Sequence, residues 1–90
     1  YYNRGLRQFS LNKYDEAIAD FSKVIGLNPR DAEAYNSRGV SKYELKQYQG
    51  AIKDLTKAIQ LDPNYADAHY NRGLAIMSAE DDQRANANDE

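Results

Sequence analysis

Side chains that perform catalysis or hold metal ions are scarce in this chain of 90 residues. It has one histidine, His69, and no cysteine, so a Cys–His pair, a zinc site or a two-histidine metal motif cannot be built. Acidic pairs such as Asp15-Glu16 carry groups suited to acid–base chemistry, but they lie on polar stretches, where carboxylates are normally solvated. The five glycines stand singly and form no phosphate-binding loop. We therefore expect no enzymatic activity, no metal and no cofactor.

Composition narrows the class of partner. Hydrophobic residues make up 41% and charged residues 29% of the chain, as expected for a soluble, folded domain. The formal net charge is −2, which argues against a duplex nucleic-acid binder, since such proteins carry a basic field. No apolar run approaches the ~20 residues that span a bilayer, so we expect no membrane insertion. The compartment stays open, with the cytoplasm slightly favoured.

The most informative feature of the sequence is a repeat of 34 residues. Residues 1–31 and 35–65 are identical at 12 of 31 aligned positions, which indicates an internal duplication. A third, partial copy follows. The dipeptide Arg-Gly marks all three copies, as Arg4-Gly5, Arg38-Gly39 and Arg72-Gly73.

Each full repeat carries two helical patterns. In its second half, apolar residues fall at steps of three and four, which predicts one buried helix face. The connectors at 12–13 and 46–47 are short and predict antiparallel neighbours. Pro29 and Pro63 disfavour helix in the residue before them and close each unit. The predicted helices are 2–11, 14–27, 32–45, 48–61 and 66–80, with a polar, frayed tail at 81–90.

This unit resembles the tetratricopeptide repeat over residues 1 to about 79. The resemblance rests on an aromatic, a glycine, a second tyrosine, an alanine and a closing proline, at Tyr1/Tyr35, Gly5/Gly39, Tyr14/Tyr48, Ala17/Ala51 and Pro29/Pro63. It implies an all-α fold of stacked antiparallel hairpins, a right-handed superhelix with repeats at 1–31 and 32–65 and a half-repeat at 66–80. The chain departs from the family at Arg4, Arg38 and Arg72, where leucine is frequent, and at His69, which replaces tyrosine.

In tetratricopeptide proteins a stripe on the first helices lines a concave peptide groove. The resemblance implies that the matching residues bind an extended peptide or partner protein, and these are Tyr2, Asn3, Leu6, Phe9, Asn36, Ser37, Val40, Tyr43, Tyr70, Asn71 and Leu74. Asn3, Ser37 and Asn71 share one repeat position and resemble the asparagine ladder of some family members, which grips a peptide backbone. The tyrosines are suited to supply apolar contact. The alternative is that these side chains pack between neighbouring repeats or are simply solvated.

A second family mode, the carboxylate clamp of chaperone-binding members, uses lysines, an arginine and asparagines. No cation stands at the matching positions, which are Tyr2, Leu6, Ser37, Asp67 and Asn71. We therefore expect no clamp. Glu33, Glu44 and Asp67 make the groove slightly acidic and favour neutral or basic ligands.

Two further expectations concern packing and association. Co-repetition predicts ion pairs from Arg4 to Asp20 and from Arg38 to Asp54, while Gly5 and Gly39 let the paired helices approach closely, with Ala17 and Ala51 as the small partners. The leading functional hypothesis is a protein-interaction scaffold, acting alone or within a longer protein. The alternative is a homodimerisation module, because the last helix lacks a hairpin partner and would expose His69, Gly73 and Ile76.

Overall fold

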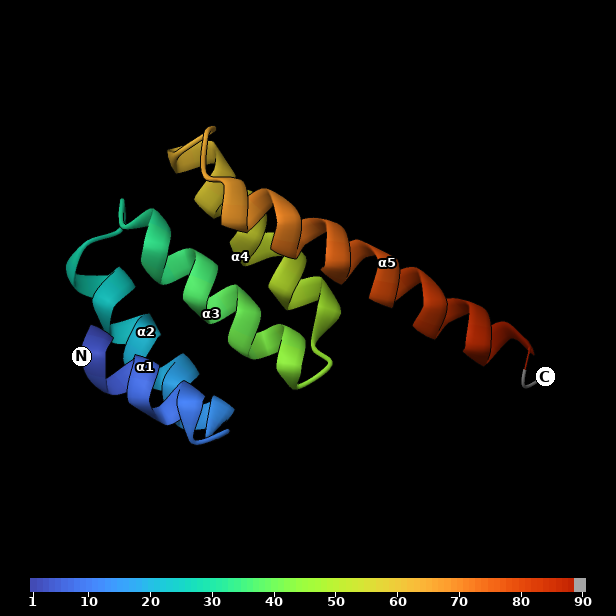
Figure 1. The fold of residues 1–90 in the computed structure, drawn as a ribbon, viewed down its shortest axis with the longest axis horizontal. Helices are drawn as coiled ribbons and strands as arrows, with labels where there is room; N and C mark the ends of the chain where they lie inside the picture. The colour runs from blue at the N-terminus through green and yellow to red at the C-terminus, as the bar shows by residue number, and fades with distance from the viewer. Residues whose placement is uncertain (89–90) are drawn as a thin grey trace.

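The computed structural model describes residues 1–88, which form five helices and no strand. The helices are α1 (Tyr2–Ser10), α2 (Tyr14–Leu27), α3 (Ala32–Glu44), α4 (Tyr48–Leu61) and α5 (Ala66–Asn88). The first four match their predicted ranges to within one residue at each end. Consecutive helices run antiparallel, so the predicted all-α stack of hairpins is confirmed (Figure 1).

The turns that close the two full repeats are built alike. Asn28 Oδ1 accepts a hydrogen bond from the backbone N–H of Arg30, and Asp62 Oδ1 accepts one from Asn64, both at 3.2 Å. Each turn thus combines a proline with a short polar side chain that bonds its own backbone two residues on. Asp31 then caps α3 by accepting the backbone N–H of the third helical residue at 3.1 Å. The helix stops predicted from the prolines are confirmed.

The turns inside the hairpins depend on one left-handed residue each. Asn12 has φ 61° and Lys46 has φ 63°, and the chain reverses at both positions. The equivalent residue in the third copy is Glu80, which is helical instead. The predicted helix end at 80 is wrong, because α5 continues to Asn88. The added stretch contains neither glycine nor proline, so nothing in its sequence terminates the helix; residues 89–90 of the predicted tail lie outside the described part.

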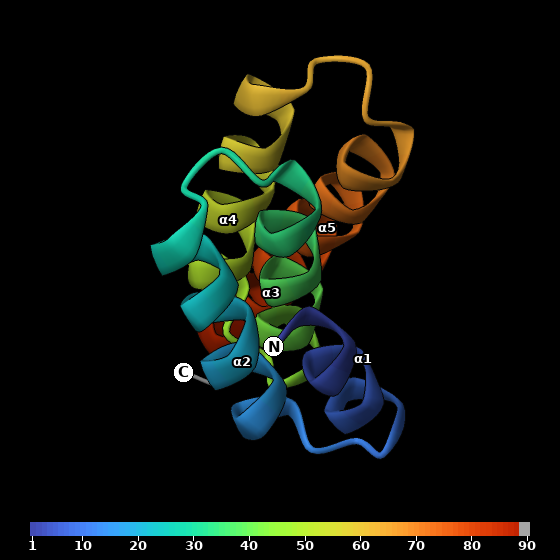
Figure 2. The same cartoon turned by 90° about the vertical axis from the view of Figure 1, so that its left-hand side faces the viewer.

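The helices lie in two layers. Figure 2 shows α1, α3 and α5 along one side of the molecule and α2 and α4 along the other. The space between the layers is filled by two large residues, Phe21 from α2 and Leu55 from α4, which are both fully buried. Small residues close the remaining contacts, namely the fully buried Ala17, Ala34, Ala51, Ala58, Ala68 and Ala75. Such narrow contacts let neighbouring helices approach closely.

Glycine sets the spacing inside each hairpin. A Cβ atom built on Gly5 would lie 2.6 Å from Cε1 of Phe21, and one on Gly39 would lie 2.9 Å from Cγ of Leu55. The close approach predicted at these glycines is therefore present. The space is occupied by Phe21 and Leu55 rather than by an alanine side chain, and Ala51 contributes its carbonyl oxygen, 3.2 Å from the same Cβ position on Gly39.

Both predicted ion pairs are present. Arg4 Nη2 lies 2.7 Å from Asp20 Oδ1, and Arg38 Nη2 lies 2.8 Å from Asp54 Oδ1. In each pair the arginine Nε also donates to the carboxylate, so the contact has the fork geometry of a strong charge-assisted bond. These hydrogen bonds from Arg4 hold the pKa of Asp20 below its ordinary value of 3.8, against the opposing effect of burial.

The pair in the second repeat also joins neighbouring repeats. Arg38 Nη1 donates to Ser22 Oγ of α2 at 3.1 Å, so the guanidinium connects α2, α3 and α4. Lys42 Nζ lies 3.0 Å from the other carboxylate oxygen of Asp54. Asp54 is nearly fully buried and is thus compensated by two cations, as a buried carboxylate requires.

We expect Gly39→Ala to destabilise the fold and Gly73→Ala to stabilise it. A Cβ at Gly39 collides with the buried Leu55 and the Ala51 carbonyl, whereas at Gly73 no described atom lies within 4 Å. Overpacking costs about 1–3 kcal/mol, and alanine at an open helical position gains about 0.5–1 kcal/mol over glycine. Urea unfolding of both variants measures the difference. Equal stability of the two would contradict the role assigned to Gly39.

We expect Asp20→Asn to destabilise the fold at neutral pH and to have no effect on stability in acid. Since the folded-state pKa of Asp20 is depressed, the contribution of the pair is complete above pH 3.8 and disappears as the pH falls through the folded value. The urea midpoint of the variant should therefore lie below that of the wild type at pH 7 and converge with it in acid. Asp15→Asn, at an exposed position in the first turn of α2, is the matched control. A gap that does not change with pH would refute this account.

Candidate functional site

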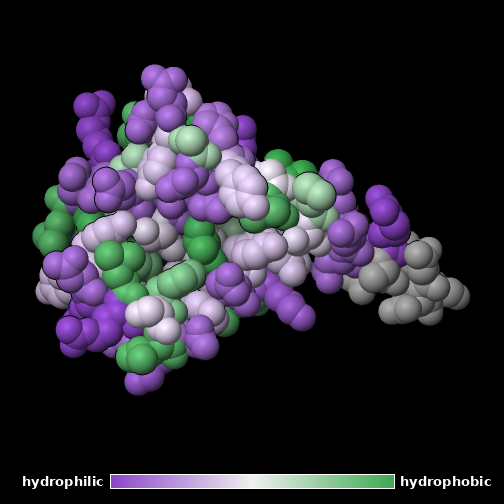
Figure 3. Space-filling view, in the orientation of Figure 1, coloured by the Kyte–Doolittle hydropathy of each residue, from purple (hydrophilic) through white to green (hydrophobic). Residues whose placement is uncertain are grey.

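The residues expected to bind a peptide all lie on the layer formed by α1, α3 and α5. Figure 3 views this face and shows hydrophobic patches over its α1–α3 side, bordered by hydrophilic residues. Tyr70 and Leu6 are the most open of the large members, with 69% and 44% of their surface exposed, and Asn3 is exposed as well. The others are half-buried, namely Tyr2, Phe9, Asn36, Ser37, Val40, Tyr43, Asn71 and Leu74.

A small hollow lies between α1 and α3. Its volume is about 100 Å³, and it is lined by Leu6, Phe9, Asn36, Ser37 and Val40, with Phe21 of α2 as the sixth wall. The structure thus gathers five of the predicted groove residues around one mostly apolar depression. Phe21 was not among the predicted residues, because the sequence places it on the buried face of the second helix. The signal that could have identified it is Gly5, whose missing side chain leaves the Phe21 ring in contact with α1.

Several groove residues also connect neighbouring repeats. Tyr2 Oη lies 3.0 Å from Ser37 Oγ, and Asn71 Nδ2 donates to Asn36 Oδ1 at 3.2 Å. These two bonds occupy the same pair of repeat positions, one repeat apart, so each joins one first helix to the next. Packing between repeats, the alternative reading of this stripe, is therefore present for these four side chains.

Tyr43 is similarly engaged. Its hydroxyl lies 3.1 Å from Ser78 Oγ of α5, and its ring centroid lies 5.7 Å from that of Tyr48. The ring also packs against the core cluster that contains Leu55 and Ala75. Tyr43 thus holds α3 against α5, whereas the more exposed Tyr70 contributes its surface mainly to the open face.

Acidic residues surround the end of the groove at which α3 and α5 begin. An open cleft of about 600 Å³ is lined there by four acidic residues and one arginine, together with Tyr65; the charged residues are Asp31, Glu33, Asp62, Asp67 and Arg30. Burial raises the pKa of the Tyr65 hydroxyl above its ordinary value, and the charges of Glu33 and Asp67 raise it further. Carboxylates outnumber the single arginine in this lining, and on that excess the expected preference for neutral or basic ligands depends.

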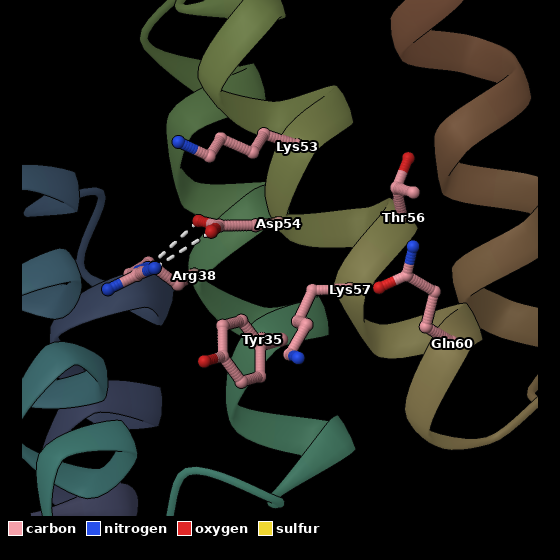
Figure 4. Close-up of a pocket in the computed structure, with 7 residues that line it drawn as sticks. All are labelled: Tyr35, Arg38, Lys53, Asp54, Thr56, Lys57 and Gln60. Carbon is pink, nitrogen blue, oxygen red and sulfur yellow. Dashed lines mark hydrogen bonds and ion pairs between the residues drawn. The ribbon is translucent and has the colours of Figure 1, made fainter.

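A second cleft lies outside the groove, between α3 and α4. It measures about 450 Å³ and is lined by Tyr35, Arg38, Lys53, Asp54, Thr56, Lys57 and Gln60. Figure 4 shows the Arg38–Asp54 pair within it, together with the other lining residues. Although this cleft is larger than the hollow, its central charges already neutralise each other as part of the hairpin. The first-helix face therefore remains the candidate site.

The described residues contain no group of three histidine, cysteine or acidic side chains placed to hold a metal ion. None of the helices among them is both long and apolar enough to cross a membrane.

The repeat architecture, the Arg–Asp hairpins and the first-helix face together define a tetratricopeptide array. Residues 5–46 and 41–78 match the TPR repeat family, and the chain belongs to that family. No curated protein sequence matches the chain significantly.

Solved structures give the same result. The first TPR of Spaghetti (RPAP3), bound to the HSP90 peptide SRMEEVD, superposes with a TM-score of 0.87 at 28% identity, over 89% of this chain. The first TPR domain of the human RPAP3 protein superposes with a TM-score of 0.88 at 25% identity, over 92% of this chain. The chain spans 64% and 65% of those two domains. The family supports protein–protein interaction and peptide binding as the class of function.

We expect Tyr43→Phe to lower the free energy of unfolding by about 0.5–1.5 kcal/mol, the usual value of one lost hydrogen bond. The substitution removes only the hydroxyl that contacts Ser78 and keeps the packed ring. Tyr70→Phe is the control, because Tyr70 is 69% exposed and should change stability little. Equilibrium urea unfolding separates the two. Equal effects would show that the Tyr43–Ser78 contact does not stabilise the α3–α5 junction.

Proposed function

We propose that the chain binds an extended segment of a partner protein along the face formed by α1, α3 and α5. The observation that carries this proposal is the apolar hollow at Leu6, Phe9 and Val40, which opens on the same face as the exposed Tyr70. Such a surface offers a pocket for an anchoring side chain and a rigid tyrosine, and binding energy at interfaces is concentrated in pockets and at aromatic residues of this kind.

The hollow is suited to one aliphatic side chain of the ligand, given its size and its apolar walls. Asn3 is exposed and free to bond the ligand backbone. Asn71 donates to Asn36, but an amide carries two donors and a separate acceptor oxygen, so it can hold α3 and a peptide together. Ser37 and Tyr2 bond each other and would contribute less to a ligand.

The chemistry of this ligand differs from that of the acidic peptide SRMEEVD bound to the Spaghetti TPR. The positions that match a carboxylate clamp carry no cation, and Asp67 adds negative charge at one end. We infer a neutral or basic extended segment. A groove of this length falls below the ~800 Å² per partner of a standard interface, so an affinity in the micromolar range, about −8 kcal/mol, is expected.

The test uses peptides selected on the immobilised wild-type chain from a display library of random sequences. Leu6→Glu places a charge beside the hollow and should weaken a selected peptide about tenfold or more, measured by fluorescence polarisation. Tyr70→Ala removes the exposed ring and should weaken binding to a similar extent. Neither change touches the buried core, because both residues are exposed.

Leu27→Glu is the matched control, since Leu27 is 76% exposed on α2, in the opposite layer, and should leave affinity within about twofold. The peptide SRMEEVD should bind much more weakly than the selected peptides. If the selected peptides bind Leu6→Glu and Tyr70→Ala as tightly as the wild type, the first-helix face is not the site. Tight binding of SRMEEVD would overturn the inferred ligand chemistry.

A further inference from the structure

One face of α5 repeats the surface that α1 and α3 use to hold their hairpin partners. It carries His69, Arg72, Gly73 and Ile76, at the repeat positions that α3 fills with Tyr35, Arg38, Gly39 and Lys42. A Cβ built on Gly73 meets no described atom within 4 Å, whereas the same atom on Gly5 or Gly39 collides with a buried side chain. The glycine surface is present on α5, but no helix in the described chain packs against it.

The equivalent surfaces of α1 and α3, which are covered by α2 and α4, indicate what kind of helix packs on this surface. Over Gly5 and Gly39 lie helices whose sequences share one pattern, Ala-Ile-x-Asp followed by Phe or Leu, at residues 17–21 and 51–55. The aspartate pairs with the arginine that precedes each glycine, at 2.7 and 2.8 Å. The large residue after it fills the space left by the glycine. The charged residue and the space-filling residue therefore stand at adjacent positions of one helix.

The described part of the chain does not supply a third such helix. The chain reverses at Asn12 and Lys46, but at the equivalent Glu80 it stays helical and α5 continues to Asn88 (Figure 1). Within residues 1–84, whose side chains are described, no carboxylate forms an ion pair with Arg72. Ile76 is 38% exposed and stands where α3 has Lys42, so this copy of the surface is more apolar than the filled ones.

We propose that this face of α5 is a docking site for an amphipathic helix of a partner protein. The docked helix carries an alanine, an acidic residue three positions later, and then a leucine or phenylalanine. The acidic residue pairs with Arg72 in the fork geometry seen at Arg38, the large residue fills the space over Gly73, and the alanine permits the close backbone approach. The site is separate from the peptide groove, which lies on other residues of the same helix.

The test uses a fluorescent peptide of residues 47–62, the helix that fills this position on α3, titrated against the whole chain. Gly73→Leu occupies the open space and should weaken binding about tenfold or more. Gly26→Leu is the matched control, because Gly26 is also an exposed helical glycine at which an added Cβ meets no described side chain within 4 Å, but it lies on α2. Both substitutions replace an open glycine in a helix and should preserve the fold.

The expected ion pair between Arg72 and the aspartate of the peptide is tested by exchanging the two charges. Arg72→Glu should weaken the peptide about tenfold, and a peptide carrying Asp54→Arg should recover the affinity with that variant alone. A peptide that binds Gly73→Leu as well as the wild type has displaced α4 instead, which would overturn the proposal. No binding at about 1 mM would also overturn it. So would a wild type that forms dimers which Gly73→Leu abolishes, since the occupant would then be a second copy.

A second measurement distinguishes this docking site from the proposed peptide-binding face. It uses the peptides selected from the display library on the wild-type chain. Gly73→Leu should leave those peptides unaffected, because Gly73 does not line the hollow between α1 and α3. Loss of both ligands in this variant would mean that α5 itself has been perturbed, and the proposal would fail.

Discussion

The close contact of two helices at a glycine is the interaction on which the rest of this structure depends. Phe21 and Leu55 are fully buried because Gly5 and Gly39 offer no side chain to keep them away. The same approach brings each arginine one residue earlier within reach of an aspartate on the partner helix. Packing and electrostatics are therefore coupled, since separating the helices at the glycine would also leave a nearly buried carboxylate without its cation.

Stacking of the hairpins follows from this contact. With both second helices held on one side, the first helices lie next to each other and their polar side chains meet across the layer, as Tyr2 does with Ser37. Arg38 adds a bond to Ser22 of the preceding repeat. Within the part of the chain that the structure describes, each repeat contacts only its neighbours, the usual arrangement in solenoid proteins. Residues that we propose to face a ligand also hold the array together, so we expect mutational effects on binding and stability to overlap at Tyr2 and Tyr43.

Charge divides the surface into regions with different preferences. Burial, together with the charges of Glu33 and Asp67, raises the pKa of Tyr65, and carboxylates outnumber cations in the cleft where α3 and α5 begin. On α5, Arg72 presents the opposite charge beside an open glycine. The chain shares the TPR fold with the RPAP3 domains at 25–28% identity, and no cation stands at the positions that match a carboxylate clamp. Within one fold, function depends on the side chains of the site, and under our proposal these few residues set the choice of ligand.

The sequence alone determined the fold class, four helices to within one residue, the family and both ion pairs, because repetition at 34 residues exposes every position that the architecture constrains. The turns at Pro29 and Pro63 were also predictable, because proline disfavours helix in the residue before it. The end of α5 could not be read locally, since a polar stretch without glycine or proline is compatible with either helix or coil. Only the tertiary structure decided that Phe21 forms a wall of the hollow between α1 and α3 and that Asn36 and Asn71 bond each other. Such contacts depend on the crossing angle between packed helices, and this angle cannot be derived from the sequence periodicity of a single helix.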